Sequence, residues 1–521
     1  MAQEAAAVQE AVAAVDKQQL NIKTMKKVFL IIAILVPMFV KAQTENDMFE
    51  FSAIYYNGTA KSAAMGNALG AVGSDFTGIS INPAGLGLFR KATFLFTPSF
   101  YTTSTESSYK GSNGLDRTFK SPLNNVGITW TQEMNEGALN SISFSLGINQ
   151  LNNFSYNALV NGDNMNTSLI DAFFTEMSAN NIINENDLLN NDDAHFANTI
   201  YPLWATYLFD FNNDGTYSTS IPQGNLNQRY SVSKTGGSHE FSFATGFNFE
   251  DKWFLGVSLN IPYFEKDATN TYQERNLANE YFKYWDQEEY ISHVGRGVNA
   301  KLGAIIFPAK WLRLGASFHS PTFYKIDETW HTSTYALFND GYEYYESPTG
   351  TYSYTITTPY RLNASAAFIF GNYGMLTADY EFVDYSKMKA SGSGTDYSYF
   401  NDYIKSLYGP TSNIRLGGEW RWQSLCFRAG YAFYGSPYGI DKTDLRTNSY
   451  SCGLGYTHHR FTIDAAYVFS QRKNSYELYS QYSMYPAYYP DSNDDWAVDD
   501  TKVKETTDMN QVVISFRFRL D

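Results

Sequence analysis

Apolar and polar residues alternate one by one along most of this 521-residue chain after residue 91. Successive side chains of a β-strand point to opposite faces, so each such run predicts a strand with one apolar and one polar face. The same alternation occurs over 141–149 and 461–470. Near the C-terminus, the apolar series is Val512, Ile514, Phe516, Phe518 and Leu520, and the intervening series is Val513, Ser515, Arg517 and Arg519. Runs of this length can cross a membrane at a tilt.

The connections between these runs fall into two classes that alternate along the chain. We place about fourteen strands, an even number as in bacterial barrels, near residues 92, 122, 138, 238, 252, 292, 310, 351, 373, 411, 424, 447, 460 and 508. Short turns follow at 135–137, 250–252, 308–310, 371–374, 423–424 and 458–460. Long polar loops lie at 105–121, 152–236, 265–290, 336–350, 387–410, 437–446 and 475–507.

This sorting of loops separates two architectures that share the alternation. A soluble β-sandwich has no reason to place short turns at one end and long loops at the other, whereas outer-membrane barrels do so. The sequence therefore predicts an all-β fold, a 14-stranded antiparallel transmembrane β-barrel over residues 92–521. Its periplasmic turns are short, both termini lie in the periplasm, and a large extracellular loop is inserted at 152–236.

The start of the chain has the pattern of an export signal. Two lysines after Met25 precede an apolar run over 28–39, and Val40-Lys41-Ala42 is a small-residue cleavage site. The apolar run is shorter than the roughly 20 residues of a membrane-spanning helix. We therefore interpret residues 25–42 as a signal peptide and residues 1–24 as a non-native N-terminal extension.

Residues 43–91 differ from the rest of the chain and form a predicted plug. Between Ser62 and Arg90, six glycines and many Ala and Ser residues argue against any long regular element and favour a compact, bent segment. Asn82-Pro83-Ala84-Gly85 has turn chemistry, in which proline fixes its own φ and Gly85 can adopt a positive φ. Small residues permit close backbone packing, so we expect this segment to lie inside the barrel.

The plug also carries a family resemblance. The segment from Ala64 to Leu86, with its glycine-rich opening, Asp75, and Asn82-Pro83-Ala84 just before the first strand, resembles the N-terminal hatch of the FadL family, in a Bacteroidetes-type member. The resemblance implies a monomeric barrel in the outer membrane of a Gram-negative bacterium, in contact with membrane lipid and lipopolysaccharide. It further implies passive transport of hydrophobic small molecules such as long-chain fatty acids.

The resemblance also supplies candidate site residues. Asn82, Pro83, Ala84 and Gly85 would form the moving or gating element, and Phe76, Leu86 and Phe89 would line it. Alternatively, these residues simply fit the plug into the barrel. A second function of another class is a scaffold or shuttle barrel of a protein secretion system.

Composition and motifs exclude several other classes. The net charge of −15 and the absence of a basic stripe argue against nucleic acid as a partner. The sequence has no nucleophile elbow, phosphate-binding loop or Cys-x-x-Cys pair, and its seven His are scattered, so we predict neither an enzyme nor a cofactor. Cys426 and Cys452 lie on neighbouring predicted strands with opposite orientations, so no disulfide is expected.

The loop at 152–236 holds two further patterns. Leu169, Ile170, Phe173, Phe174 and Met177 have helical spacing, with Ser168 as a cap and with Asp171 and Glu176 on the opposite side. Such a helix either presents an apolar landing surface or packs on neighbouring loops. Asp210, Asn212 and Asp214 match the first half of a calcium loop, although Ile221 stands where a bidentate Glu is expected; this is a weak calcium candidate.

Charges on the inward faces of the strands allow two interpretations. They comprise Lys301, Arg313, Asp379, Glu381, Arg415, Glu419, Arg421, Arg428, Asp464, Arg517 and Arg519. One or two of the arginines could hold a fatty-acid carboxylate through a charge-assisted pair. Because both signs are present, the other interpretation is a set of interior ion pairs that join barrel and plug.

Overall fold

The computed structural model describes residues 45–134, 137–191, 195–278, 281–439, 445–479 and 501–520. The predicted extension at 1–24 and the predicted signal peptide at 25–42 lie outside the described residues, as do the first two residues of the plug.

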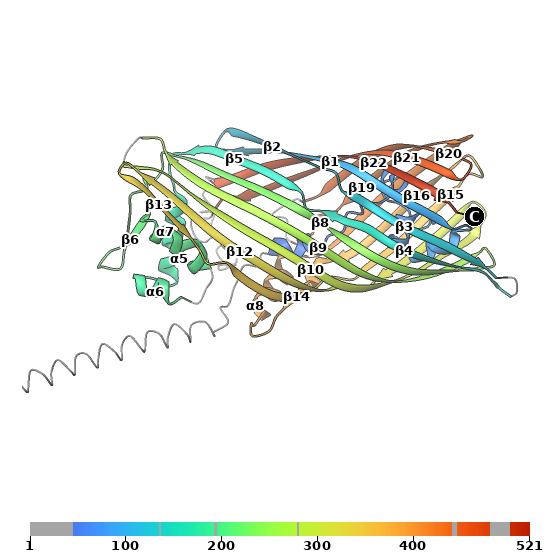
Figure 1. The fold of residues 1–521 in the computed structure, drawn as a ribbon, viewed down its shortest axis with the longest axis horizontal. Coiled ribbons are helices and arrows are strands. Elements are labelled where there is room, and N and C mark those ends of the chain that lie inside the picture. Colours follow the sequence, from blue (N-terminus) through green and yellow to red (C-terminus); the bar gives the residue numbers. More distant parts are fainter. Residues whose placement is uncertain are drawn as a thin grey trace, which may run out of the picture.

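Fourteen strands form a closed antiparallel barrel, in which β22 pairs with β1 to complete the ring (Figure 1). In ring order they are β1 (Thr93–Tyr109), β3 (Leu123–Glu133), β4 (Leu139–Asn153), β8 (Leu226–Phe249), β9 (Trp253–Asn276), β10 (Phe282–Ala309), β11 (Leu312–His319), β15 (Arg361–Ile369), β16 (Gly374–Asp384), β18 (Pro410–Trp422), β19 (Leu425–Tyr434), β20 (Thr447–His458), β21 (Phe461–Glu477) and β22 (Lys502–Arg519). The predicted fold class is confirmed, and Cys426 and Cys452 are free, as expected.

Several wall strands continue beyond a break as outer strands. β2 (Ser112–Lys120) precedes β3, β5 (Tyr156–Asn164) follows β4, β12 (Phe323–Phe338) follows β11, and β14 (Gly350–Thr357) precedes β15. Three of the four breaks contain a proline, Pro122, Pro321 or Pro359, which cannot donate to a ladder. The strand predicted near residue 351 is therefore β14, and it continues into the wall as β15. Short outer strands are β13 (Gly341–Glu346) and β17 (Lys389–Ser391).

Three of the predicted long loops, 105–121, 265–290 and 336–350, are mostly strand, so this part of the prediction is wrong. β9 runs to Asn276 and β10 begins at Phe282, within the predicted loop 265–290, and β1 runs to Tyr109. The backbone ladder continues here, but the outward residues of β9 are polar from Glu265 onward, including Thr269, Thr271 and Gln273. Alternation of apolar and polar residues disappears when the outward face leaves lipid, although the strand itself does not end.

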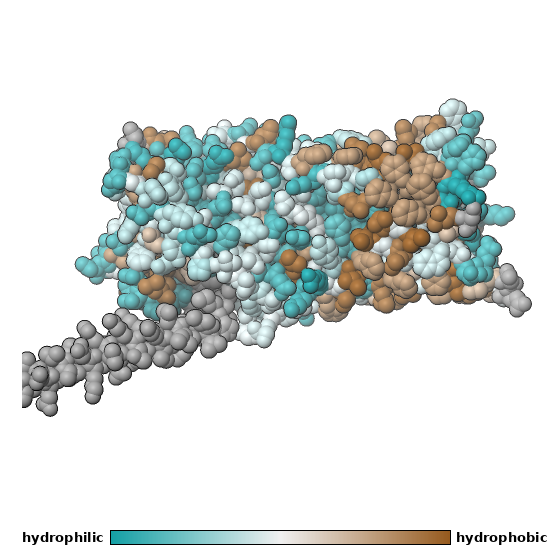
Figure 2. All heavy atoms as spheres, viewed as in Figure 1, coloured by the Kyte–Doolittle hydropathy of each residue, from teal (hydrophilic) through white to brown (hydrophobic). Residues whose placement is uncertain are grey.

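An apolar belt surrounds the half of the barrel that carries the short turns. Figure 2 shows it as a brown area, whereas the other half is mostly teal and white with scattered brown. On β9 the exposed outward residues are Trp253, Leu255, Val257, Leu259, Ile261 and Tyr263. This length matches the roughly 9–11 residues of a tilted membrane-spanning strand. Tyr and Trp are frequent at both edges, for example Trp130, Trp311, Trp420 and Trp422 at the turn side and Tyr263, Tyr360 and Tyr450 at the other.

No helix among the described residues is long and apolar enough to cross a membrane. The belt and its aromatic edges identify the wall strands as the membrane-spanning part, and the barrel extends well beyond the belt on the side of the long connections.

Short helices make up the plug, which occupies the lumen (Figure 1). They are α2 (Glu45–Ser52), α3 (Ala60–Ala64), α4 (Phe76–Ile81) and the 3₁₀ helix η1 (Pro83–Leu88). Asp75 caps α4 by accepting from the backbone N–H groups of Thr77 and Gly78, and it also accepts from the hydroxyl of Thr59. Glycine content and local caps thus give several short helices rather than one long element.

A helical cap, defined as residues 165–225, lies at the outer end of the barrel (Figure 1). It contains α5 (Leu169–Ala179), α6 (Glu185–Leu189), the π-helix η2 (Phe196–Ile200), α7 (Tyr201–Ala205), and the hairpin of β6 (Phe209–Phe211) and β7 (Tyr217–Thr219). Elsewhere on the outer side are the 3₁₀ helix η3 (Tyr385–Lys387) and α8 (Ser398–Leu407). The cap and the inward faces of β9, β10 and β12 share one apolar core.

The predicted helix of the cap is confirmed as α5, with Ser168 as its N-cap in a capping box with Asp171. Leu169, Phe173 and Met177 are buried in the shared core, so this side of α5 packs rather than forming an exposed landing surface. Glu176 was expected on the exposed side, but it is buried and lies 3.2 Å from the His195 ring. The partner His195, which directly precedes η2 and lies 19 positions further along the chain, explains this difference.

Candidate ligand path between plug and barrel wall

Inward-facing glycines form a belt where the plug meets the wall. An added Cβ at each of nine wall glycines would lie within about 3 Å of plug atoms: Gly127, Gly147, Gly246, Gly256, Gly303, Gly315, Gly417, Gly430 and Gly453. At Gly256, for example, it would lie 2.2 Å from the carbonyl carbon of Pro83. Only residues without a side chain permit this approach. The plug is therefore seated directly against the backbone of the wall.

Asn82 joins three parts of the structure. Its side-chain amide donates to the carbonyl of Gly70 in the plug at 2.8 Å and to the carbonyl of Ala304 on β10 at 3.3 Å. Its Oδ1 accepts from the N–H of Ala84 at 3.1 Å, which caps η1. Asn82 thus fixes the start of η1 to the wall.

Gly85 has a different role from the one expected. It lies within η1, and its φ is not in the left-handed region, so the predicted positive φ is wrong. Positive φ instead occurs at Gly66 and Gly73. An added Cβ at Gly85 would lie 3.1 Å from the Cα of Gly73, and Gly85 O accepts from Ser74 N–H. Close approach of two plug segments therefore requires glycine here.

Wall side chains bind the plug backbone from several directions. Asp379 accepts from the N–H of Gly70 at 2.9 Å, and Arg313 donates to the carbonyl of Val72 at 2.8 Å. Ser317 donates to the carbonyl of Ile81 at 2.7 Å, and the His319 ring lies 2.9 Å from the same oxygen. These bonds satisfy buried backbone groups that short helices leave unpaired.

Most of the predicted inward charges form buried ion pairs. Glu381 lies 2.8 Å from Arg361 and 3.5 Å from Arg415. Arg428 lies 2.7 Å from both Glu419 and Asp464. The interpretation as interior ion pairs is therefore the better description of this set, and Arg361 further ties it to the plug by donating to Ser52 O.

The other predicted inward charges range from buried to exposed. Lys301 pairs with Glu240 at 2.5 Å in the lumen. Arg421 and Arg519 are exposed near the turn side, where Arg421 pairs with Glu419 at 2.6 Å and Arg519 donates to His459 O at 3.3 Å. Arg517 is half-buried, and its Nε has no hydrogen-bond partner among the residues that the structure describes.

The predicted lining residues Phe76, Leu86 and Phe89 do come together. They share an apolar cluster with Leu95 of β1 and Ala244 of β8. A small pocket of about 10 Å³ opens beside this cluster, lined by Ser74, Asp75, Phe76, Phe89, Thr93, Leu95, Thr129 and Arg517. We call it the inner pocket. It combines apolar side chains with the carboxylate of Asp75 and the guanidinium of Arg517.

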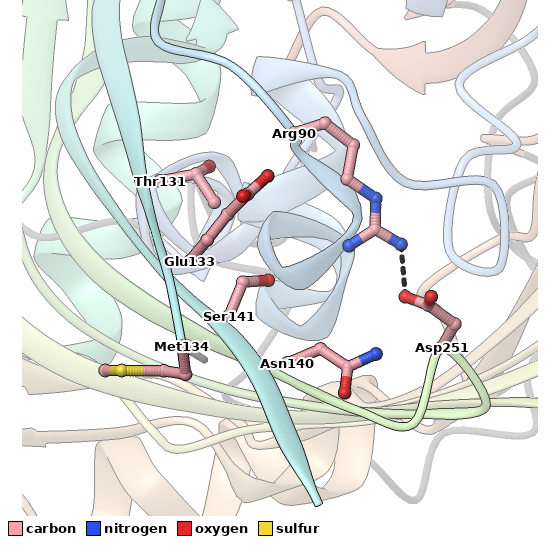
Figure 3. A pocket seen from close by; sticks show the side chains of 7 residues that line it. All are labelled: Arg90, Thr131, Glu133, Met134, Asn140, Ser141 and Asp251. Carbon is pink, nitrogen blue, oxygen red and sulfur yellow. Dashed lines mark hydrogen bonds and ion pairs between the residues drawn. The ribbon is translucent and has the colours of Figure 1, made fainter. Parts of the chain in front are cut away.

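A second pocket of about 260 Å³ lies at the turn side, and we call it the exit pocket (Figure 3). It is lined by Arg90, Thr131, Glu133, Met134, Asn140, Ser141 and Asp251. Arg90, near the end of the predicted plug at 43–91, faces Asp251 of the β8–β9 turn across the pocket at 2.5 Å. Thr131 donates to Phe89 O at 3.3 Å. Phe89 and Arg90 therefore separate the two pockets.

The calcium candidate forms a hairpin turn between β6 and β7. Oδ1 of Asp214 accepts from the N–H of Thr216 at 3.1 Å and from its hydroxyl at 2.6 Å, and the Asn212 amide donates to the same hydroxyl. Asp210 accepts from the N–H of Phe211 at 2.8 Å. Within the described ranges, no group of three or more His, Cys, Asp or Glu residues is placed to hold a metal ion.

Sequence reasoning missed the belt of wall glycines, the Arg90–Asp251 pair and the anchoring of α2. Lys266 of β9 pairs with Asp47 and, at 2.6 Å, with Glu50. Inward glycine in an alternating strand is a usable signal for close backbone approach, whereas ion pairs between distant segments have no local sequence signal.

The geometry can be compared with solved structures. A FadL homologue of Pseudomonas aeruginosa is similar at 11% identity and a TM-score of 0.55, with 90% of this chain and 100% of that chain covered. The toluene transporter TodX of Pseudomonas putida is similar at 12% identity and a TM-score of 0.51, with 89% and 99% covered. No protein-family model and no curated protein matches the sequence. The chain therefore has the fold of the FadL-type outer-membrane barrels, a 14-stranded wall closed around its own N-terminal segment.

Proposed function

We propose that this protein is a passive outer-membrane transporter, a monomer without enzymatic activity, for hydrophobic small molecules such as long-chain fatty acids. The inner pocket carries the proposal, because it places apolar Phe76, Phe89 and Leu95 beside the unpartnered Nε of Arg517. Because the pocket measures about 10 Å³ while the plug is docked, a hydrocarbon chain would lie against these apolar side chains only once the plug moves. A terminal carboxylate would then pair with the guanidinium. The names of the two similar structures, a FadL homologue and a toluene transporter, support a hydrophobic cargo.

The plug would gate this route. Ligand would enter from the outer end, reach the inner pocket, and leave through the exit pocket once Phe89 and Arg90 move. The segment Asn82–Pro83–Ala84–Gly85 holds η1 on the wall, so its release would move Leu86 and Phe89 together. The close seating against wall glycines leaves little room for passage while the plug is docked.

Filling the inner pocket tests the proposal. Leu95 points inward and Phe94, its neighbour on β1, points outward into the belt. L95W should lower uptake of a labelled long-chain fatty acid by roughly tenfold, because overpacking this space costs about 1–3 kcal/mol. F94W should leave uptake unchanged, and both variants should remain heat-modifiable on gels.

Mass spectrometry of an organic extract of the purified protein supplies the second measurement. We expect one hydrophobic compound in stoichiometric amount, reduced in L95W. Equal uptake by L95W and F94W, together with an extract free of such a compound, would reject a transport role at this pocket.

One observation favours a second function, a scaffold or shuttle barrel in protein secretion. The outer half of the barrel and its helical cap extend far beyond the apolar belt and offer a large polar surface (Figure 2). Copurification of exported proteins in stoichiometric amount, in place of a hydrophobic compound, would support this alternative.

A further inference from the structure

Basic side chains border the outer edge of the apolar belt on β10 and β12. In the direction away from the belt, the next outward residue after the exposed Val298 of β10 is Arg296. On β12, the next outward residue after the exposed Phe323 is Lys325. Arg296 and Lys325 are both exposed and stand directly opposite each other in the antiparallel register. Two positive charges are thus held side by side where the apolar surface ends.

A third basic residue extends this group. Lys389 of β17 is exposed and stands opposite Thr357 of β14, and Thr355 of the same strand stands opposite Lys325. The register therefore places Lys389 and Lys325 on either side of β14.

Two acids lie near the group but form no ion pair with Arg296 or Lys325 among the described residues. Glu265 of β9 and Asp327 of β12 are the acidic outward residues one step further from the belt, and Asp327 accepts from the Ser353 hydroxyl at 2.6 Å. Neither Arg296 nor Lys325 forms an ion pair with any described residue. Like charges directly opposite on neighbouring strands repel each other, so this arrangement favours a bound anion.

The position identifies the chemistry of that anion. A basic residue at the membrane surface attracts anionic lipid headgroups, and arginine binds phosphate through two parallel hydrogen bonds. A lipid headgroup at this boundary carries acyl chains that can lie on Val298 and Phe323. A free anion in solution has no such chains. A phosphorylated lipid satisfies both the charge and the apolar surface.

We propose that Arg296, Lys325 and Lys389 bind the phosphorylated headgroup of a lipid of the outer leaflet. By binding a lipid headgroup on one side of the barrel wall, the site orients the barrel relative to the membrane surface. It depends on the membrane-spanning barrel alone and is independent of the proposed transport.

The test uses the full chain in detergent, with bisphosphorylated lipid A as the probe and native mass spectrometry as the readout. R296Q/K325Q/K389Q should weaken binding by at least about tenfold. The control R117Q/R229Q/K504Q removes three exposed positive charges farther from the belt and should bind as the unmodified protein does. The single variant K325Q should give an intermediate loss, and heat-modifiability checks folding in each case.

Two further arms identify the source of the anion. Dephosphorylated lipid A should bind weakly to all variants, and inorganic phosphate should not displace the phosphorylated lipid. Equal binding by the two triple variants, equal binding of the dephosphorylated lipid, or displacement by inorganic phosphate would overturn the proposal.

Discussion

Replacing Gly417 with valine is expected to release the plug from the barrel wall while the barrel itself stays folded. Gly417 points into the lumen from β18, and an added Cβ would lie 2.6 Å from the backbone oxygen of Met65 and 2.9 Å from its Cβ. Overpacking of this kind costs about 1–3 kcal/mol, and a clash with backbone leaves few ways to relax. The docking equilibrium should therefore shift by roughly 5- to 150-fold, seen as faster proteolysis of residues 45–91 and higher conductance for small hydrophilic solutes.

The neighbouring residue provides a matched control. Gly418 points outward, and an added Cβ would lie 3.2 Å from the end of the flexible Leu376 side chain and 3.9 Å, an ordinary contact distance, from the backbone oxygen of Met375. G418V should keep the plug docked and the conductance low. Both variants should remain heat-modifiable. Equal proteolysis and equal conductance in the two variants would show that the glycine belt does not seat the plug.

Replacing Glu274 with alanine is expected to release the helical cap. Glu274 of β9 is buried and accepts from five neutral donors, namely Ser168 Oγ at 2.6 Å, Leu169 N, Gln228 Nε2 and Tyr272 OH at 2.8 Å, and Trp285 Nε1 at 3.1 Å. Ser168 and Leu169 begin α5, so this carboxyl group joins the cap to the barrel. An unsatisfied buried donor costs about 1–3 kcal/mol, so E274A should lower the docking free energy of the cap by at least about 3 kcal/mol.

Hydrogen exchange over residues 165–225 measures this effect, with E343A on the exposed strand β13 as the control.

Burial raises the pKa of Glu274 above its ordinary value of 4.5. The docked state therefore holds its proton more tightly, so docking is strongest below about pH 4.5 and weakens as pH rises above it. E274Q should remove this pH dependence. Unchanged exchange in E274A would show that the cap is held by its apolar core alone.

The residue pattern predicted the barrel because lipid outside and a polar lumen inside impose alternation on every wall strand. It failed where that constraint ends. The sequence predicts a loop at Thr269, Thr271 and Gln273, because the outward face of β9 is in water there. The strand nevertheless continues through these residues. Glu274, in the same predicted loop, gave no signal of its role, since its five donors come from four separate parts of the chain.

In the plug, too, the sequence predicted some features and not others. Its glycine content predicted a compact, bent segment, and Phe76, Leu86 and Phe89 do share a cluster. The reason for each glycine was not readable from the sequence, because Gly85 is required by its approach to Gly73 and not by its own φ. Which wall residue faces which plug residue depends on the register of the closed ring.

A plug locked by a reversible cross-link tests the central claim that hydrophobic molecules cross only when the plug moves. Ala60 N donates to Ser515 Oγ of β22 at 2.7 Å, so cysteines at these two positions lie within reach of each other. In a C426S/C452S background, A60C/S515C should take up labelled fatty acid only after reduction. Under oxidising conditions, uptake should fall to the level of cells without the protein. Uptake that is equal in the oxidised and reduced states would contradict the account.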